Sequence, residues 1–161
     1  MAGQGTPATV ALHRAGVPFT VHTYSHDLRT PGYGMQAAQA LGVDAVRVHK
    51  TLIASVDGNL VVAVVPVSHT LDLKALTAAV GGKRGSLAGA DEATRATGYV
   101  IGGISPFGQR RTLPTVLDVA AAEHPTVFVS GGRRGMQVEV APSDLLALTG
   151  GTLARIASDG D

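Results

Sequence analysis

The fold is decided by residues 51–65, which read TLIASVDGNLVVAVV. Two apolar arms, residues 51–56 and 60–65, flank Asp57, Gly58 and Asn59, and an Asp-Gly pair between apolar arms is a strong signal of a tight hairpin turn. The second arm is apolar without alternation, which is typical of a strand that is buried on both faces of a sheet. The stretch therefore predicts a β-hairpin whose second strand lies at the centre of the domain.

Helices are predicted on both sides of this hairpin. The first runs from Thr6 to Ala15, because Thr6 is a good N-cap, Pro7 suits the first helical position and Gly16 suits the residue after the helix. Four further helices are predicted, and each ends one or two residues before a glycine. They cover residues 33–41, 71–80, 91–97 and 143–148, the last with Ser143 as N-cap.

Other short apolar segments are typical of strands. They cover residues 19–26, 99–101, 115–118, 126–130 and 136–140. Since hairpins and helices mix along the chain, we expect an α+β fold with a mixed sheet.

Length and composition limit the possible classes of protein. The 161 residues suit one domain, 1–161, with an ordered core over about 6–157, and 45% of them are hydrophobic against 16% charged. The N-terminus lacks the basic and apolar regions of a signal peptide, and the longest apolar run, 60–65, is too short to span a membrane. We therefore expect a cytoplasmic protein without a membrane partner.

The charge and the missing residue types exclude several functions. A net charge of only +1 argues against a general nucleic-acid coat, so DNA is not an expected partner, although a local phosphate site remains open. The absence of cysteine excludes a disulfide framework, a thiolate nucleophile and a cysteine-zinc site. The sequence also lacks the Gly-x-Ser-x-Gly elbow, the Walker loop and the His-Glu-x-x-His motif. No cofactor is expected.

A metal site is not expected either. His22 and His26 have the spacing of helical metal ligands, but they lie in a strand pattern, where four residues span roughly 13 Å. In that strand His22, Tyr24 and His26 share one face, which could stack on a base or ribose. A half-exposed strand with a solvated face explains the same pattern.

Lys50 is a second candidate. Regular alternation puts Lys50 on the strand face of Leu52 and Ala54. A lysine at that place either extends its ammonium group to water or lies in a cleft, where it can bind phosphate or polarise a carbonyl oxygen.

Two glycine-rich loops, residues 98–108 and 130–135, form the third candidate feature. Glycine permits positive φ, so successive backbone N–H groups can point at one phosphate or oxyanion. Tight turns alone would also explain the glycines. Arg110 and Arg111 follow the first loop, and Arg133 and Arg134 lie in the second. These four arginines could contact RNA phosphates or simply form a solvated surface.

These features occur in the order and spacing of the YbaK family of trans-editing tRNA deacylases, which the chain resembles from about Thr6 to about Ala157. The resemblance rests on His22 to Asp27, Lys50 to Leu52, Leu71 to Lys74, Thr97 to Tyr99 with Gly102 to Pro106, Leu113 to Thr115, and Ser130 to Gly135.

The resemblance implies a mixed, partly barrel-like sheet with flanking helices. It also implies hydrolysis of cysteine wrongly attached to proline tRNA, with mischarged tRNA(Pro) as partner and a complex with prolyl-tRNA synthetase as a further hypothesis. The implied catalytic residues are Lys50, Gly102 and Gly103. The implied substrate-binding residues are His22, Tyr24, Thr51, Ile104, Ser105, Ser130, Gly131 and Gln137.

Gln137 departs from the family pattern, which has Asp at this position. Glutamine keeps the hydrogen bonding but lacks a negative charge that could hold the substrate's amino group, so the change bears on amino-acid preference. An aminoacyl ester is already activated, and the resemblance implies that the cysteine thiol attacks its own carbonyl, without a protein nucleophile. The alternatives are an Ala-tRNA(Pro) deacylase of the same family and a non-catalytic module that binds tRNA or a synthetase.

Overall fold

The predicted hairpin is present in the computed structural model, which describes residues 5–25 and 32–158. Strands β2 (His49–Val56) and β3 (Asn59–Pro66) pair antiparallel, with Thr51 opposite Val64. Asp57 and Gly58 both have positive φ, 51° and 85°, as a tight hairpin turn requires. The Asp57 carboxylate accepts backbone N–H bonds from residues 83 and 84, at 2.9 Å each, which fixes the turn against the neighbouring chain.

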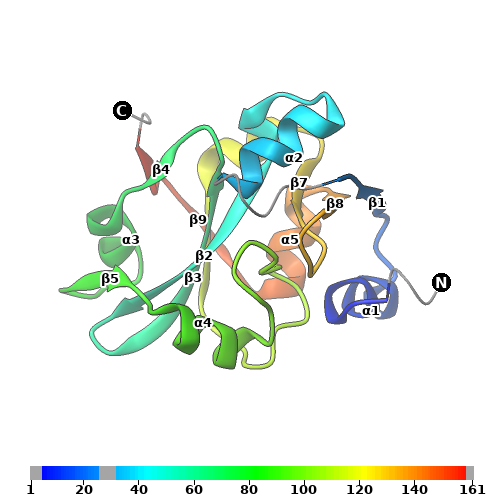
Figure 1. Cartoon of the computed structure of the whole chain (residues 1–161). Helices are drawn as coiled ribbons and strands as arrows, with labels where there is room; N and C mark the ends of the chain where they lie inside the picture. The colour runs from blue at the N-terminus through cyan, green and yellow to red at the C-terminus, as the bar shows by residue number, and fades with distance from the viewer. Residues whose placement is uncertain (1–4, 26–31, 159–161) are drawn as a thin grey trace.

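The hairpin lies within a five-stranded sheet of order β5-β2-β3-β6-β9 (Figure 1). The added strands are β5 (Gly85–Leu87), β6 (Thr115–Asp118) and β9 (Thr152–Ala154). The β3–β6 and β6–β9 pairs are parallel and the others antiparallel. The sheet is therefore mixed, which confirms the predicted α+β class.

β3 is buried on both faces, as its unbroken apolar run predicted. Val62 and Val64 belong to one core cluster, which includes buried residues of helices α1, α4 and α5. Val61, Ala63 and Val65 belong to a second cluster around Leu76 of α3. The sheet thus separates two apolar layers.

A second, three-stranded antiparallel sheet has the order β1-β8-β7. Its strands are β1 (Thr20–Thr23), β7 (Val127–Ser130) and β8 (Met136–Val140). One parallel bridge between Val48 and Phe128 brings the start of β2 beside β7. A short pair, β4 (Thr70–Leu71) with β10 (Ala157–Ser158), lies near the C-terminus.

The five α-helices of the described residues flank these sheets. They are α1 (Pro7–Ala15), α2 (Tyr33–Leu41), α3 (Leu73–Ala79), α4 (Ala90–Thr97) and α5 (Pro142–Thr149), and two 3₁₀ turns span Ala45–Arg47 and Val119–Glu123. In the ranges 5–25 and 32–158, no helix has the length and apolar character needed to cross a membrane. Figure 1 places α1 beside the three-stranded sheet and α3 at the opposite end of the molecule.

The helix predictions need two corrections. Leu71 pairs with Ala157 in β4, so α3 begins only after Asp72, whose carboxylate caps it by accepting from the N–H of Ala75 at 3.0 Å. Ser143 is inside α5, whose N-cap is Ala141, because Pro142 already has the backbone shape of a first helical residue.

Two strand predictions also change. Residues 99–101 are not a strand, because the N–H of Gly103 bonds back to Val100 and closes a turn, and the Tyr99 hydroxyl donates to the Phe107 carbonyl at 2.5 Å. The predicted strand 19–26 is shortened to Thr20–Thr23. His26, from which the metal and stacking hypotheses began, lies outside the described residues.

Asp118 ties the sheet to the C-terminal segment. Its carboxylate, only 3% exposed, accepts backbone N–H bonds from Ala120 (3.0 Å), Ile156 (2.9 Å) and Ala157 (2.9 Å). We predict that Asp118→Ala lowers the free energy of unfolding by about 3 kcal/mol or more, because three donors lose one acceptor. Urea unfolding at neutral pH measures this loss.

The matched control is Asp91→Ala, which removes an exposed carboxylate from the first turn of α4 and costs less than about 1 kcal/mol. Equal losses in the two variants would contradict the role assigned to Asp118.

Candidate functional site

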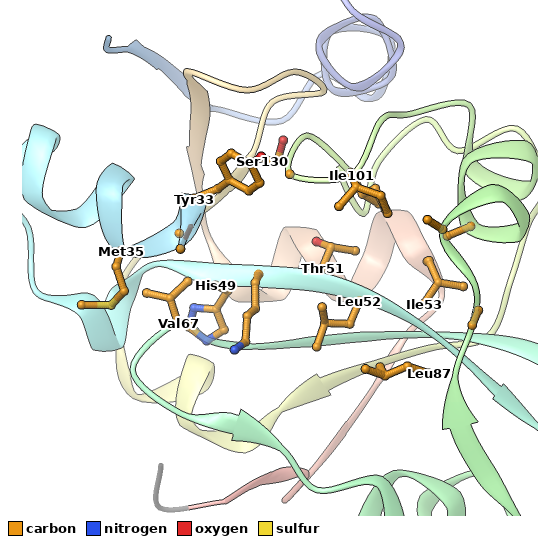
Figure 2. A pocket seen from close by; sticks show the side chains of 18 of the residues that line it. Tyr33, Met35, His49, Thr51, Leu52, Ile53, Val67, Leu87, Ile101 and Ser130 are labelled. Atoms are coloured by element: carbon orange, nitrogen blue, oxygen red, sulfur yellow. The ribbon is translucent and has the colours of Figure 1, made fainter. Parts of the chain in front are cut away.

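A cavity of about 450 Å³ lies against the first half of β2 (Figure 2). It is lined from β2 itself, from the start of α2, from the segment 87–93, from the first glycine loop, and from β7 and β8. The lining residues are Gly32, Tyr33, Gly34, Met35, His49, Lys50, Thr51, Leu52, Ile53, Val67, Leu87, Ala88, Ala90, Ala93, Ile101, Gly102, Ile104, Ser130 and Gln137.

The cavity exists because β2 has a short neighbour on one side. β5 pairs only with Ala54 to Val56, so in the described chain residues 50–53 of β2 have no strand partner on the side away from β3. The Ile53 carbonyl accepts from the N–H of Ala88 at 2.9 Å, on the side away from β3. Since these backbone groups alternate in direction along a strand, those of Thr51 also point away from β3, at the open edge. Side chains from both faces of β2 reach the cavity around this edge.

The two glycine loops meet at the cavity mouth. A Cβ atom on Gly103 would lie 2.8 Å from the Arg133 Cα atom, and one on Gly102 would lie 2.6 Å from the Tyr33 ring. Gly102 also has φ of +87°, which other residues rarely adopt. Glycine is therefore required at both positions for this loop to approach the second loop and α2.

Arg134 holds this mouth together. Its Nε atom donates to the Ile101 carbonyl at 2.8 Å, and its guanidinium carbon lies 4.8 Å from the centre of the Tyr33 ring. One side chain thus joins the second glycine loop to the first loop and to α2.

Three buried polar atoms have no hydrogen-bond partner among the described residues, and all three belong to residues that line this cavity. They are His49 Nε2, Thr51 Oγ1 and Gln137 Oε1. An unpaired buried polar atom costs about 1–3 kcal/mol unless water or a ligand pairs with it. Their convergence on one apolar cavity is typical of a ligand site.

The His49 ring is held in one tautomer. Its Nδ1 atom lies 3.3 Å from the Arg47 carbonyl oxygen, which can only accept, so Nδ1 carries the hydrogen. Burial lowers the pKa of His49 to about 4, outweighing the Arg47 carbonyl, which raises it. At neutral pH the ring is uncharged, and Nε2 keeps its lone pair as an acceptor.

Among the described residues, Lys50 is the one cation of the cavity lining. It is half-buried, and burial lowers its pKa below the ordinary value. Within the described residues its ammonium group forms no ion pair or hydrogen bond. That leaves the ammonium group available to a ligand.

The cavity brings together six of the residues predicted from the sequence: Lys50, Thr51, Gly102, Ile104, Ser130 and Gln137. Figure 2 shows Thr51 and Ser130 on the same side of β2 as Ile101, with Leu52 and Leu87 on the other side. Tyr24 is outside the lining but within reach of it, because the Gln137 amide donates to its hydroxyl at 3.5 Å.

Four other predicted residues lie outside the lining. Gly103 and Gly131 shape the loops, with the Gly131 carbonyl accepting from the Thr6 hydroxyl at 2.6 Å. Ser105 is fully buried, and its hydroxyl accepts from the N–H of Phe107 at 3.2 Å. His22 bonds to Glu139 at 3.0 Å.

His22 is held within the three-stranded sheet by its contact with Glu139. The Thr126 hydroxyl, at 2.6 Å, and His22 both bond to the Glu139 carboxylate and hold its pKa below the usual range. The His22 ring also lies 5.3 Å from the ring of Phe128. His22 therefore contacts its own sheet in the described structure.

The four arginines separate into two groups. Arg134 is used within the protein, as described above. Arg110, Arg111 and Arg133 are exposed outside the cavity lining. A contact between any of these four and RNA stays a prediction.

Sequence reasoning did not single out His49 or Tyr33. The available signal for His49 was its place beside Lys50 at the start of a strand that becomes buried. The sequence could not show that its second nitrogen lacks a partner, because that depends on what α2, β3 and β7 bring around it.

No group of three His, Asp or Glu side chains that could hold a metal ion occurs within residues 5–25 and 32–158. The fold and the cavity define a class of protein: an α+β domain with a mostly apolar cavity at the open edge of one strand. Residues 32–148 match the family model described as “Aminoacyl-tRNA editing domain”. The chain belongs to this family, which confirms the YbaK-type resemblance, and it is an aminoacyl-tRNA deacylase, an editing hydrolase.

Relatives and solved structures agree with this assignment. The chain is 40% identical over 124 residues to “Putative Cys-tRNA(Pro)/Cys-tRNA(Cys) deacylase EbsC” of Enterococcus faecalis, covering 75% of this chain and 74% of EbsC. It is 32% identical to “Uncharacterized protein YwhH” of Bacillus subtilis, covering 68% and 70% of the two chains. A solved structure described as “a putative trans-editing enzyme for prolyl tRNA synthetase” has a TM-score of 0.84 at 30% identity, over 96% of this chain and 98% of that one.

The lowered pKa of His49 predicts a pH-dependent stability. The unfolded chain takes up a proton near pH 6.5, whereas the folded chain takes it up only near about pH 4. The unfolded state thus binds more protons between these values, and folding stability falls as the pH drops from 6.5 toward 4. His49→Gln has no titrating ring at this position. Between pH 7.5 and 5 the free energy of unfolding of wild type therefore falls by about 2 kcal/mol more than that of the variant.

Urea unfolding of both proteins at the two pH values measures the difference. Other titrating groups, Glu139 among them, are common to both proteins and cancel. Equal losses would mean that the His49 ring is accessible to water in solution.

Proposed function

We propose that the protein hydrolyses mischarged Cys-tRNA(Pro) in trans. The observation that carries the proposal is that Lys50 and three unpartnered polar atoms line one cavity in a chain of the editing family. The relative EbsC, described as a Cys-tRNA(Pro)/Cys-tRNA(Cys) deacylase, supports the choice of cysteine and of proline tRNA. An editing site is needed because a synthetase pocket rejects a small or similar amino acid only weakly.

The cavity suits an aminoacyl group rather than a larger ligand. Its walls are mostly apolar, and its polar atoms lie at a few positions, as in sites that orient a small substrate. We assign the mouth, between Gly102 and Arg134, to the ribose and terminal phosphate of the tRNA. Lys50 then holds the ester carbonyl oxygen or that phosphate, and the backbone N–H groups of the first glycine loop support the developing oxyanion.

The proposed chemistry uses the substrate's own nucleophile. The cysteine sulfur attacks the carbonyl carbon of its ester, the bond from that carbon to the ribose oxygen breaks, and the thiol proton ends on this oxygen. The amino acid leaves as a cyclic thiolactone, which water then opens to free cysteine, and the tRNA regains its free hydroxyl. The protein contributes orientation and charge stabilisation, which are worth several orders of magnitude in rate for a well-placed intramolecular reaction.

The proposed partners are mischarged tRNA(Pro) and, in a larger complex, prolyl-tRNA synthetase. The exposed Arg110, Arg111 and Arg133 are candidates for phosphate contacts because they surround the loops that form the mouth. Loss of such contacts weakens tRNA binding by the same factor for every attached amino acid, so the amino-acid preference does not change. We expect the reaction to occur in the cytoplasm.

The substrate prediction is that Cys-tRNA(Pro) is deacylated faster than Ala-tRNA(Pro) or Pro-tRNA(Pro). The reason is that only cysteine carries the attacking thiol. Release of radiolabelled amino acid from each tRNA under identical conditions measures the preference. Preferential release of alanine would favour the alanyl alternative, which Gln137 keeps open, and release from none would refute the proposed function.

The second prediction concerns Lys50. Lys50→Ala lowers turnover of Cys-tRNA(Pro) by roughly 100-fold or more, the scale of losing one oxyanion donor. Lys50→Arg is also impaired, because the wider planar guanidinium places its charge elsewhere. Single-turnover deacylation measures the rate, and a filter-binding assay measures tRNA affinity.

The matched control is Lys74→Ala, which removes an exposed cation on α3 outside the cavity lining and leaves the rate unchanged. A Lys50→Ala protein with normal turnover would refute the catalytic role. A variant that loses tRNA binding and turnover in parallel would favour the non-catalytic binding module.

A further inference from the structure

His49 lines the cavity, but the proposed mechanism gives it no role. It is 2% exposed, lies in β2 directly before Lys50, and lines the cavity with an unpartnered Nε2 atom. Figure 2 shows its ring beside Val67, at the end of the cavity toward Met35 and away from Ile101. If the tRNA enters by the glycine loops near Ile101, His49 lies toward the far end, where the amino-acid side chain would lie.

The ring can offer only an acceptor there. Its Nδ1–H is committed to the Arg47 carbonyl at 3.3 Å, and its low pKa keeps Nε2 unprotonated at neutral pH. A substrate donor must therefore come to Nε2, because no described protein group supplies one.

We infer that His49 is a specificity-determining residue, whose Nε2 atom accepts a hydrogen bond from a side-chain thiol or hydroxyl of the bound aminoacyl group. The inference rests on the proposed function and names the chemistry by which the same cavity selects its substrate. An alanyl group has no such donor, so the buried Nε2 atom stays unpaired in its complex, whereas a thiol or hydroxyl pairs with it. A site with an acceptor for a substrate donor rejects an analogue without that donor, because the acceptor is left unpaired.

The α-ammonium group is the competing donor, and the charges disfavour it. The cavity lining contains Lys50 and no Asp or Glu within the described residues. Asp118 acts electrostatically on His49 from outside this lining, but its carboxylate already accepts three backbone N–H bonds. A second cation next to Lys50 would be repelled, and uncharged His49 and Gln137 cannot offset its charge. A neutral thiol or hydroxyl avoids this cost.

The test measures binding separately from hydrolysis. Cysteine, serine and alanine are joined by an amide bond to 3′-amino-3′-deoxyadenosine, which the enzyme cannot cleave as an ester. Calorimetric titration of wild type is expected to give Kd values for the cysteinyl and seryl analogues about 10-fold or more below that of the alanyl analogue. In His49→Phe, which keeps the ring size but removes the acceptor, that ratio falls below about 3.

Two further variants complete the experiment. His49→Gln retains an acceptor and is expected to keep part of the preference. It therefore distinguishes loss of the acceptor from a folding defect in the Phe variant. His69→Phe makes the same substitution outside the cavity lining, where His69 bonds to Ser68, and keeps the full preference.

The outcomes separate the inference from the proposed function. An unchanged ratio in His49→Phe, equal weakening of all three analogues, or no preference in wild type would each overturn the role of His49. Equal weakening would mean that His49 contacts the shared amino group or supports the cavity. Selective binding by wild type, lost in His49→Phe, but without release of cysteine from Cys-tRNA(Pro), would support the role of His49 and refute the proposed reaction.

Discussion

The site depends on the unequal pairing of β2. On one side β3 pairs with β2 along its whole length, and on the other β5 reaches only Ala54 to Val56. Backbone groups near Thr51 thus face a cavity instead of another strand. The strand is rigid because β3 is buried on both faces, so the open edge holds its side chains at fixed positions. The proposed reaction, in which the protein positions an activated ester without attacking it, needs this kind of rigid frame.

The remaining elements close the space around that edge. Two glycine loops approach so closely that a Cβ atom on Gly103 would collide with the backbone of Arg133. Arg134 joins these loops to the start of α2 through the Ile101 carbonyl and the Tyr33 ring. The cavity is therefore formed by segments that are far apart in sequence, and its polar atoms remain unpartnered because the described elements around them are mostly apolar.

Electrostatics in this cavity favour a neutral substrate side chain. Lys50 brings a positive charge to the cavity lining, which we propose holds an oxyanion or phosphate, and His49 is kept uncharged by burial. Gln137 stands where the YbaK family pattern has aspartate, and it adds no negative charge to the cavity. The amino-acid preference of this chain is thus expected to come from hydrogen bonds and from the substrate's own reactivity, more than from an ion pair.

The sequence by itself determined the hairpin, the α+β class and most helix ends, since Asp-Gly turns, apolar runs and glycine stops act over a few residues. It also pointed to Lys50, Thr51, Gly102 and Ser130, through motifs whose spacing resembles a family. Only the tertiary structure decided that 99–101 is a turn, that Leu71 pairs in β4, that His22 contacts Glu139 and that His49 lines the cavity. The last three depend on contacts between distant segments, since a strand needs a partner and a buried nitrogen is unpaired only once every neighbour is in place. The segment 99–101 closes a turn through nearby hydrogen bonds and pairs with no strand of the described residues.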